Sequence, residues 1–516
     1  MYMRYNRTTA KDKWTIMMYM RDFDLMATYA YALRSSNRLS DDNIDDILTK
    51  MEQDGIYRPR NGGSVFTGQF KSIQIAWYMF GYYNKSRNKN EEKKMVFSPL
   101  GNLLLDNLKD KKKAAKIFTC MLFGNGFHQP YSQMSADFNI YAFRLIFQLL
   151  RDPRLSCKLY NDEMFYLTMF LKTVDTSTYN ELVSDILKLR SQDCKQKLSE
   201  FKKNERVIGL ACHEWRYAIG MLESACIVNI HEGAEIGKLM YGNISKQTGL
   251  PNAVRSYTKG YITLKTELIK FVDIMLENYP YYEKPYPDDI LSSKFSSDIV
   301  VEMYSFYPPE LLDELGINNE TDQAVTNMLT IASNVYYYSK EETATGVKFE
   351  EALRDAFNLF IDVDAQRLGG AGRSDVECIY HVSPKQDKKF DIEAKSTTGK
   401  LPSINIRRLR THRIQINAQY TLIVTPNYSF GVLKDIENDN SVIVKSATLA
   451  NCLYQYIAKY GRNISYSFLD DIIESNKGLD ITERVNEYVY DNFGHHATDL
   501  TVKKPKVQNE NTNPPQ

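Results

Sequence analysis

The sequence predicts a protein of several domains, in which a mainly α-helical N-terminal region precedes a C-terminal α/β domain. Three observations support this fold class. The chain has 516 residues, which is enough for more than one buried core. A proline-rich stretch over residues 279–310 separates two parts of the chain. The first part opens with helical patterns, whereas residues 374–395 alternate between apolar and polar residues as strands do.

The same observations suggest where the segments begin and end. The expected segments are an N-terminal region over 1–280 with subdomains near 1–150 and 151–280, a linker and helical connector over 281–340, an α/β domain over 341–495, and a disordered tail over 496–516. Within the connector, a helix is predicted roughly from Thr321 to Ser339. The tail is polar and contains paired prolines, which is typical of disorder.

Two helices are predicted early in the N-terminal region. Residues 39–51 begin with a capping signal and an acidic first turn, and then place Ile44, Ile47 and Leu48 on one stripe. Residues 97–106 follow a basic stretch and look like the closing helix of a winged helix.

Residues 243–257 resemble a helix-turn-helix. A short helix would end near Thr248, Gly249 would form the turn, and Pro251 would occupy the first turn of a second helix. That helix would present Asn252, Arg255 and Ser256 to a DNA groove, since Arg suits guanine and Asn suits adenine. The same pattern also occurs in plain αα-corners.

The C-terminal domain has a clear order of predicted elements. They are an amphipathic helix over 347–357, a Gly-rich turn over 369–372, strands over 374–380 and 390–395, a basic helix over 406–416, strands over 420–426 and 441–445, and a helix through 449–457.

The most informative pattern lies on the first two of these strands. Asp375 is followed eighteen positions later by Glu393-Ala394-Lys395. Side chains two apart on a strand share a face, so Glu393 and Lys395 project together while Ile392 and Ala394 point the other way. If the strands pair, Asp375 joins them at one edge of the sheet. Two carboxylates supply hard oxygen ligands for Mg²⁺, and a lysine beside them can steer an attacking water.

A third carboxylate is predicted on the preceding helix. Glu350 sits beside its apolar stripe and can point at the metal, with Glu351 as the reserve choice. An isolated Asp…Glu-x-Lys match is usually structural in so charged a chain. The order helix, Gly-rich turn, strand, strand, basic helix favours phosphodiester hydrolysis.

The basic helix offers two interpretations. Ile406, Leu409, Arg413 and Ile416 are expected on one face. The residues expected on the other side are Arg407, Arg408, Arg410 and His412. These arginines either contact DNA phosphates or form an ordinary solvated face. Gln415 and His412 either lie near the scissile phosphate or satisfy buried carbonyls.

Residues 345–457 resemble the PD-(D/E)xK nuclease fold, and the organisation of the chain is similar to type IIS restriction endonucleases of the AlwI/FokI kind. The matching pieces are Thr345–Glu350, Gly372–Asp375, Asp391–Lys395 and Tyr420–Pro426. Ser374 stands where the family signature has proline. The resemblance implies Asp375 and Glu393 as metal ligands, Lys395 as the catalytic lysine, Glu350 as the helix acid and Mg²⁺ as the cofactor.

The composition indicates which partners and which cellular compartment to expect. The formal net charge is only +1, but residues 1–120 hold 21 Lys and Arg against 13 Asp and Glu. A basic N-terminal region fits contact with DNA on one face.

The seven cysteines lack a CxxC pair, which predicts a reducing cytosol. Cys212-His213 beside Trp215 is interpreted as core. With no signal peptide and no apolar run of membrane length, we expect a protein of the prokaryotic cytoplasm with no membrane partner.

The predicted function is therefore sequence-specific cleavage of double-stranded DNA outside the recognition site. One metal centre cuts one strand, so double-strand cleavage needs a transient homodimer or a second cleavage subunit. A strand-specific nickase is an alternative, as is a repair nuclease that reads DNA structure. A helix-turn-helix protein without enzymatic activity is the other class considered. A hydrolase of small substrates has no recognisable pocket motif in the sequence.

Overall fold

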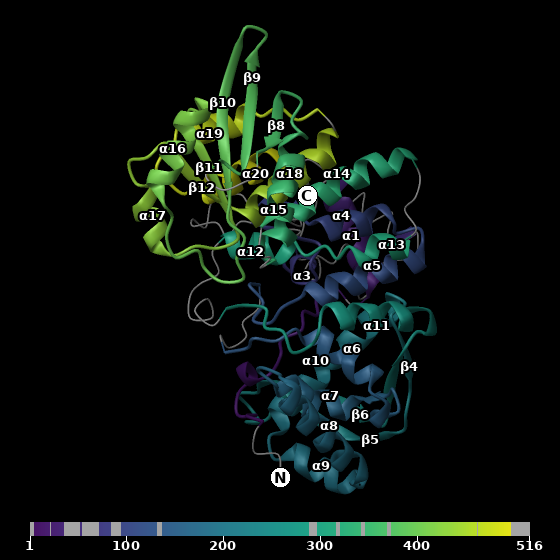
Figure 1. The fold of residues 1–516 in the computed structure, drawn as a ribbon. Coiled ribbons are helices and arrows are strands. Elements are labelled where there is room, and N and C mark those ends of the chain that lie inside the picture. The colour runs from purple at the N-terminus through teal and green to yellow at the C-terminus, as the bar shows by residue number, and fades with distance from the viewer. Residues whose placement is uncertain are drawn as a thin grey trace, which may run out of the picture.

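The computed structural model describes most of the chain, and Figure 1 shows an elongated molecule with its N-terminal and C-terminal parts at opposite ends. The described residues are 5–20, 22–35, 52–53, 72–83, 94–131, 137–287, 297–315, 320–341, 346–368, 373–461 and 463–496. Four predicted features lie wholly or mostly outside them: the helix at 39–51, the basic stretch before residue 97, the Gly-rich turn at 369–372 and, apart from His496, the tail at 496–516.

Helices dominate the N-terminal region, as the sequence predicts. The α-helices are α1 (Phe23–Ser35), α3 (Ser72–Trp77), α4 (Pro99–Asp106), α5 (Lys111–Gly124), α6 (Ala142–Arg151), α7 (Asn161–Tyr166), α8 (Thr176–Ser191), α9 (Cys194–Lys202), α10 (Glu205–Ser224) and α11 (Ile269–Asn278). Short 3₁₀ turns cover Ala10–Asp12, Pro153–Leu155, Thr168–Phe170 and Thr266–Leu268. Cys212 and Trp215 are buried on α10, which confirms their interpretation as core.

The predicted helix-turn-helix is wrong, because residues 243–257 belong to a β-hairpin. Strand β5 (Glu235–Ile244) pairs antiparallel with β6 (Pro251–Thr258), and Gly249 lies in the loop between them with φ +66°. Burial alternates along β6, which is strand periodicity. A Gly beside a Pro punctuates a hairpin as readily as a helical corner, and the flanking pattern decides between them. A separate sheet joins β3 (Leu159–Tyr160), β7 (Tyr261–Leu264) and β4 (Val228–His231).

The helix predicted at 97–106 is present as α4, which Ser98 caps through its side chain. Strands β1 (Gly81–Tyr83) and β2 (Lys94–Phe97) precede this helix. Their third neighbour is β13 (His495–His496), from the far end of the described chain. The sheet is therefore assembled from distant segments, which differs from the local strands of the predicted winged helix.

Three helices connect the two parts: α12 (Ser297–Tyr304), α13 (Glu310–Leu315) and α14 (Glu320–Ser339). The bounds of α14 confirm the helix predicted at 321–339. In this connector Val335 is fully buried and Tyr304 donates a hydrogen bond to the backbone carbonyl of Ala76.

A five-stranded sheet organises the C-terminal part, in the order β12-β11-β10-β9-β8. The strands are β8 (Val363–Arg367), β9 (Val376–Ser383), β10 (Gln386–Ala394), β11 (Thr421–Thr425) and β12 (Ser441–Lys445). Strands β10, β11 and β12 are parallel, whereas β9 and β8 run antiparallel to their neighbours. The helices are α15 (Val347–Phe357), α16 (Ile406–Ile416), α17 (Phe430–Ile436), α18 (Ser446–Tyr460), α19 (Ser467–Glu474) and α20 (Thr482–Phe493).

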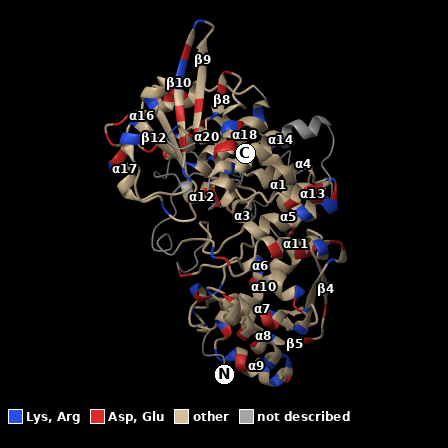
Figure 2. Ribbon diagram, in the orientation of Figure 1, with Lys and Arg blue, Asp and Glu red and all other residues tan. Residues whose placement is uncertain are grey.

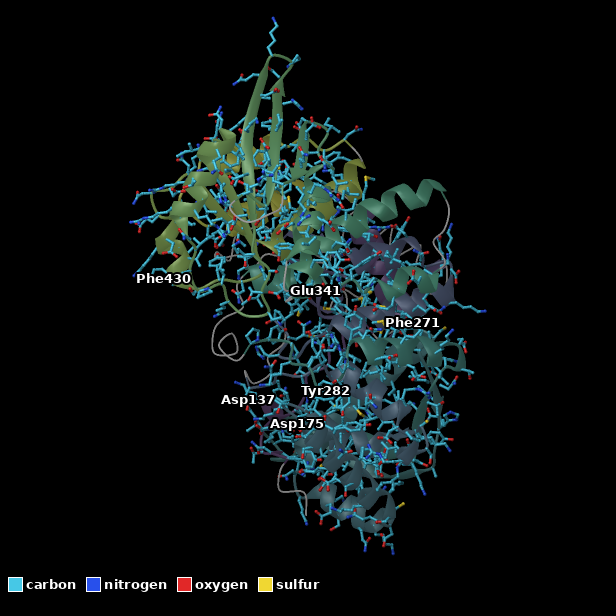
Figure 3. All side chains as sticks on the ribbon, viewed as in Figure 1. Asp137, Asp175, Phe271, Tyr282, Glu341 and Phe430 are labelled. Carbon is cyan, nitrogen blue, oxygen red and sulfur yellow. The ribbon has the colours of Figure 1, made fainter. Side chains whose placement is uncertain are left out.

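The two faces of this sheet pack against different helices. On one face, Ile392 and Leu422 belong to the large core that includes residues of α15 and α18. On the other, Ile423 packs in a smaller core with Leu409 of α16 and Val432 of α17. Because parallel pairing places Glu393 beside Ile423, Glu393 faces α16 and α17. Phe430 begins α17 at the outer edge of this part and is 70% exposed (Figure 3).

The C-terminal part also packs directly on the N-terminal region. The Asn451 side chain of α18 donates a hydrogen bond to the Tyr82 hydroxyl at 2.8 Å, and Gln455 donates one to the Phe97 carbonyl at 2.9 Å. One continuous apolar core runs through both parts. Within the described ranges, no helix combines the length and apolar character needed to cross a membrane.

Candidate active site

Asp375 lies at the entry to β9 and is tied to the neighbouring strand. Its Oδ2 accepts a hydrogen bond from the backbone N–H of Ala394 at 2.8 Å. The antiparallel register pairs Val376 with Ile392, which brings Asp375 to the end of β10 where Glu393 and Lys395 lie. The convergence predicted from the sequence is therefore present in the structure.

Glu393 is completely buried and carries two cations on one oxygen. Lys395 Nζ lies 2.5 Å from Glu393 Oε1. The Arg408 guanidinium, from α16, contacts the same Oε1. The other oxygen, Oε2, is buried and has no hydrogen-bond partner among the described residues. Because a buried carboxylate oxygen without a partner is costly, Oε2 is the oxygen available to a further cation.

The pKa of Asp375 reflects this crowded site. Burial raises its pKa above the ordinary value, and the nearby negative charge of Glu393 raises it further. Lys395 and the hydrogen bond from Ala394 act in the opposite direction. Two carboxylates that repel one another in a half-buried site favour a bound cation.

Glu350 lies on α15, the helix that precedes these strands. It is half-buried, and its Oε2 accepts from Arg367 Nε at 2.6 Å. Its negative charge adds to the raised pKa of Asp375, after burial and the charge of Glu393. Glu350 is therefore within electrostatic reach of Asp375.

The basic helix α16 differs from its prediction in one residue. His412 is only 2% exposed, although it was expected on the polar side with the arginines. It lies one helical turn beyond Arg408, and the charges of Glu393, Arg408 and Lys395 all influence its pKa, which burial lowers. Its Nδ1 has no hydrogen-bond partner among the described residues. His412 is thus packed at the site instead of facing solvent.

The arginines of α16 have different surroundings. Arg408 contacts Glu393, and Arg410 Nε lies 2.5 Å from Asp439 Oδ2. Arg413 is buried as predicted, and it donates to Thr421 and Ser441 as well as to Asp439. Arg407 is exposed. Of the three arginines predicted to bind DNA, Arg408 and Arg410 are therefore each already neutralised by a carboxylate.

Sequence reasoning missed two contacts at the site. It placed Arg408 either on DNA phosphates or on a solvated face, whereas the Arg408 guanidinium contacts Glu393. It also gave no role to Asp391, which is fully buried and accepts from Ser374 at 2.9 Å and from Thr421 at 2.6 Å. Its i−2 spacing from Glu393 was the available signal, since both side chains share one strand face.

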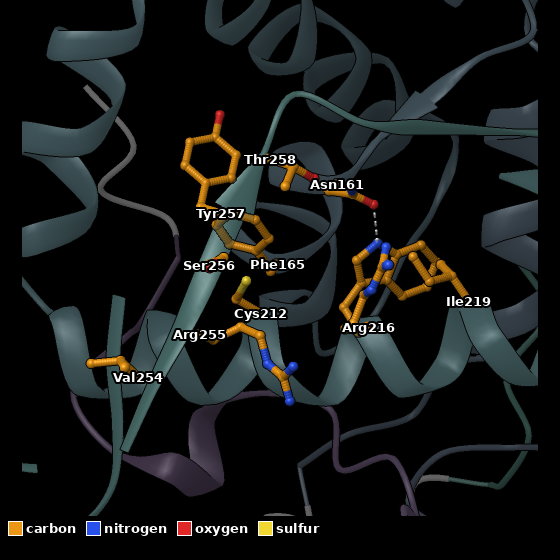
Figure 4. A pocket seen from close by; sticks show the side chains of 11 residues that line it. Asn161, Phe165, Cys212, Arg216, Ile219, Val254, Arg255, Ser256, Tyr257 and Thr258 are labelled. Atoms are coloured by element: carbon orange, nitrogen blue, oxygen red, sulfur yellow. Dashed lines mark hydrogen bonds between the residues drawn. The ribbon is translucent and has the colours of Figure 1, made fainter. Parts of the chain in front are cut away.

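The other predicted DNA-contacting residues lie on the β5–β6 hairpin. Arg255 turns toward α10, where its Nε donates to His213 Nδ1 at 3.1 Å. Asn252 and Ser256 lie on the opposite, exposed face. A pocket of about 320 Å³ between α10 and β6 includes Arg255 and Cys212 in its lining (Figure 4). The hairpin thus separates the three residues that a helix would have brought together.

Known proteins identify the family of this chain. Residues 9–279 match the family described as "Type II restriction endonuclease HgaI, N-terminal domain". The type II restriction enzyme HgaI from Avibacterium volantium is 37% identical over 493 residues, which are 93% of this chain and 98% of that enzyme. The chain belongs to the HgaI family of type II restriction endonucleases. This membership confirms the prediction of a type IIS restriction endonuclease, a site-specific deoxyribonuclease.

Two solved structures are also similar to this member of the HgaI family. Restriction endonuclease FokI bound to DNA matches with a TM-score of 0.24 and 9% identity, over 92% of this chain and 100% of that chain. Restriction endonuclease FokI alone matches with a TM-score of 0.24 and 10% identity, over 89% and 98%. A TM-score this low does not establish a shared fold.

Proposed function

We propose that Asp375, Glu393 and Lys395 form the Mg²⁺-dependent centre with which this restriction endonuclease hydrolyses DNA. The unpartnered Oε2 of the fully buried Glu393, beside Asp375, is the observation that supports this most strongly. Within the described ranges no three His, Cys, Asp or Glu residues are grouped as a metal cage. Mg²⁺ does not need one, because it is commonly held by one or two carboxylates together with waters and substrate phosphates.

The residues fit such an ion in the following way. Asp375 and Glu393 would supply its protein oxygens, with Glu350 nearby on α15. When bound, a divalent ion polarises the phosphoryl group and lowers the pKa of an attacking water. Lys395 keeps the Glu393 carboxylate in a fixed orientation by holding its Oε1. Its ammonium also supplies positive charge where the phosphoryl oxygens gain negative charge during hydrolysis.

Recognition of the DNA sequence is assigned to the N-terminal region, and the exposed face of the β5–β6 hairpin is its best-supported reading element. Cross-strand pairing places Lys238 opposite Ser256 on this face, with Asn252 nearer the loop. A two-stranded ribbon fits the major groove, where amide and ammonium groups read base edges. The hairpin is firmly seated: a Cβ on Gly209 of α10 would lie 2.2 Å from the Met240 carbonyl oxygen, so glycine permits this close approach.

Arg407 on α16 is assigned to backbone phosphates, because it is exposed on the helix that follows the catalytic strand. Figure 2 shows acidic and basic residues interspersed along β9 and β10. Phosphate contact near the centre then depends on individual side chains.

One such centre cuts one strand. Double-strand cleavage therefore requires a second copy of the chain or a second cleavage subunit, and without either the enzyme is a nickase. The test is digestion of a plasmid of known sequence with Mg²⁺ or with EDTA, followed by mapping of the ends on both strands. Ends at a fixed offset from a shared short motif support cleavage outside the site. Ends inside the motif, or scattered ends, would contradict it.

A further inference from the structure

Glu393 is paired with two cations before any metal ion binds. Lys395 and Arg408 both contact its Oε1, and Arg367 pairs with Glu350 nearby in the sequence. A divalent ion adds two positive charges beside a carboxylate that two cations already neutralise. Accommodation of that charge is easiest if one resident cation leaves Glu393.

Arg408 and Lys395 are not equivalent in their ability to leave. Lys395 follows Glu393 on the same strand end, and its backbone N–H donates to the Val424 carbonyl at 2.9 Å. The Lys395 side chain is 27% exposed, whereas that of Arg408 is 47% exposed and comes from α16 across the sheet face. A long side chain that is half in solvent can change rotamer at little cost, so Arg408 is the more mobile partner.

We propose that Arg408 is a positioning residue, which occupies Glu393 in place of the metal ion while no metal is bound. When the metal ion binds, Arg408 leaves Glu393 and contacts a DNA phosphate. This inference rests on the proposed metal centre. In the unloaded enzyme the guanidinium neutralises Glu393 and holds Oε1, so that the carboxylate stays oriented with Oε2 open. Once a metal ion neutralises Glu393 instead, the planar guanidinium of Arg408 can donate two parallel hydrogen bonds to a pair of phosphate oxygens at the cleavage position.

The neighbours of Arg408 support a change of partner. His412, one turn along the same helix face, is buried with an unpartnered Nδ1. The helix α16 contains no Asp or Glu, so no carboxylate within α16 can pair with Arg408 after it leaves Glu393. Among the described residues, the other acid paired to this helix is Asp439, and both its oxygens already accept from Arg410, Arg413 or Ser441. Exposed phosphate is then the natural acceptor.

The experiment measures divalent-ion affinity without DNA, by titration calorimetry with Mn²⁺ and with Mg²⁺. Removal of a competing positive charge should tighten binding, so Arg408→Gln is expected to bind Mn²⁺ about three- to tenfold more tightly than the natural enzyme. Arg408→Lys keeps the charge and should bind Mn²⁺ with near-natural affinity. Lys434→Gln, which removes an exposed positive charge on α17, is the control and should leave the affinity unchanged.

A second measurement distinguishes the proposed exchange of Arg408 for the metal ion from a purely structural role of Arg408. At saturating Mg²⁺, single-turnover cleavage by Arg408→Gln should be slower by roughly a hundredfold, because a phosphate-binding cation is lost. Tighter metal binding with slower cleavage is the combination that supports the inference. Unchanged or weaker Mn²⁺ binding in a folded Arg408→Gln protein would overturn it. Normal Mn²⁺ binding by Glu393→Gln would show that the proposed metal centre is wrong. That result is distinct from a failure of the Arg408 inference alone.

Discussion

Asp375 accepts a hydrogen bond from the backbone N–H of Ala394, the residue between Glu393 and Lys395. This single bond at 2.8 Å fixes the first carboxylate of the site relative to the strand that carries the other two groups. It explains how residues eighteen positions apart in the sequence lie side by side. The carboxylate is oriented by backbone, which does not depend on a neighbouring side chain.

Lys395→Met should reduce the single-turnover cleavage rate by about two to four orders of magnitude, because the variant loses the charge at the phosphoryl group and the contact that orients Glu393. DNA affinity should change little. Quenched-flow cleavage of a labelled duplex measures the rate, and filter binding measures the affinity. Lys389→Met is the control: Lys389 lies on the same strand and pairs with Glu377, away from the site. Equal rates in both variants would contradict this role.

Arg255→Ala should lower the free energy of unfolding by about 1–2 kcal/mol, because Arg255 bonds His213 and covers the rings of Tyr217 and Tyr241. Urea unfolding measures this loss.

Asn252→Ala, on the opposite face of the same strand, should leave unfolding unchanged and weaken binding to the cognate duplex by about 1–3 kcal/mol. Competition binding against random DNA measures it. If the variant still discriminates cognate from random DNA as well as the natural enzyme, the exposed hairpin face does not read bases.

His213 predicts a pH dependence of stability. Burial, and then the positive charges of Arg255 and Lys13, lowers its pKa from 6.5 to about 4. Tyr217 and Tyr241 are the other rings against it. Between these two pKa values the unfolded chain binds a proton that the folded protein does not. The stability is therefore fully present above about pH 6.5 and is lost as the pH falls toward 4.

The expected loss from His213 is about 1–2 kcal/mol, discounted because the ring is only half-buried. His213→Gln should show a smaller fall in Tm between about pH 7.5 and pH 5 than the natural protein. His381→Gln is the control: hydrogen bonds to Asp364 and Asp387 raise the pKa of this exposed histidine, so its contribution has the opposite sign. An unaltered fall in Tm for His213→Gln would refute the assignment.

The sequence predicted the C-terminal elements well because their periodicity is strong. The amphipathic helix at 347–357 and the strands that hold Asp375 and Glu393 lie where expected. The helix-turn-helix failed because its signal was a short polar turn with Gly249 and Pro251, which hairpins share. The contact of Arg408 with Glu393 depends on how the crossover lays α16 over the sheet, and no local spacing encodes that.

The same limit applies to the N-terminal region. The pairing of β2 with β13 joins residues about 400 positions apart, and a single sequence carries no local signal for such a contact. His412 shows the effect on one residue. Helical spacing alone put it on the polar side, whereas packing of α16 against β10 buries it.

We propose that Asp375 and Glu393 form the metal-dependent centre that cuts DNA. The most direct measurement combines cleavage with cognate binding for Asp375→Ala and Glu393→Ala, in Mg²⁺, with Asp387→Ala on the same hairpin as the exposed control. We predict that both site variants bind the cognate duplex with natural affinity and cut neither strand, whereas the control cuts normally. Retained cleavage in either folded site variant would contradict the account.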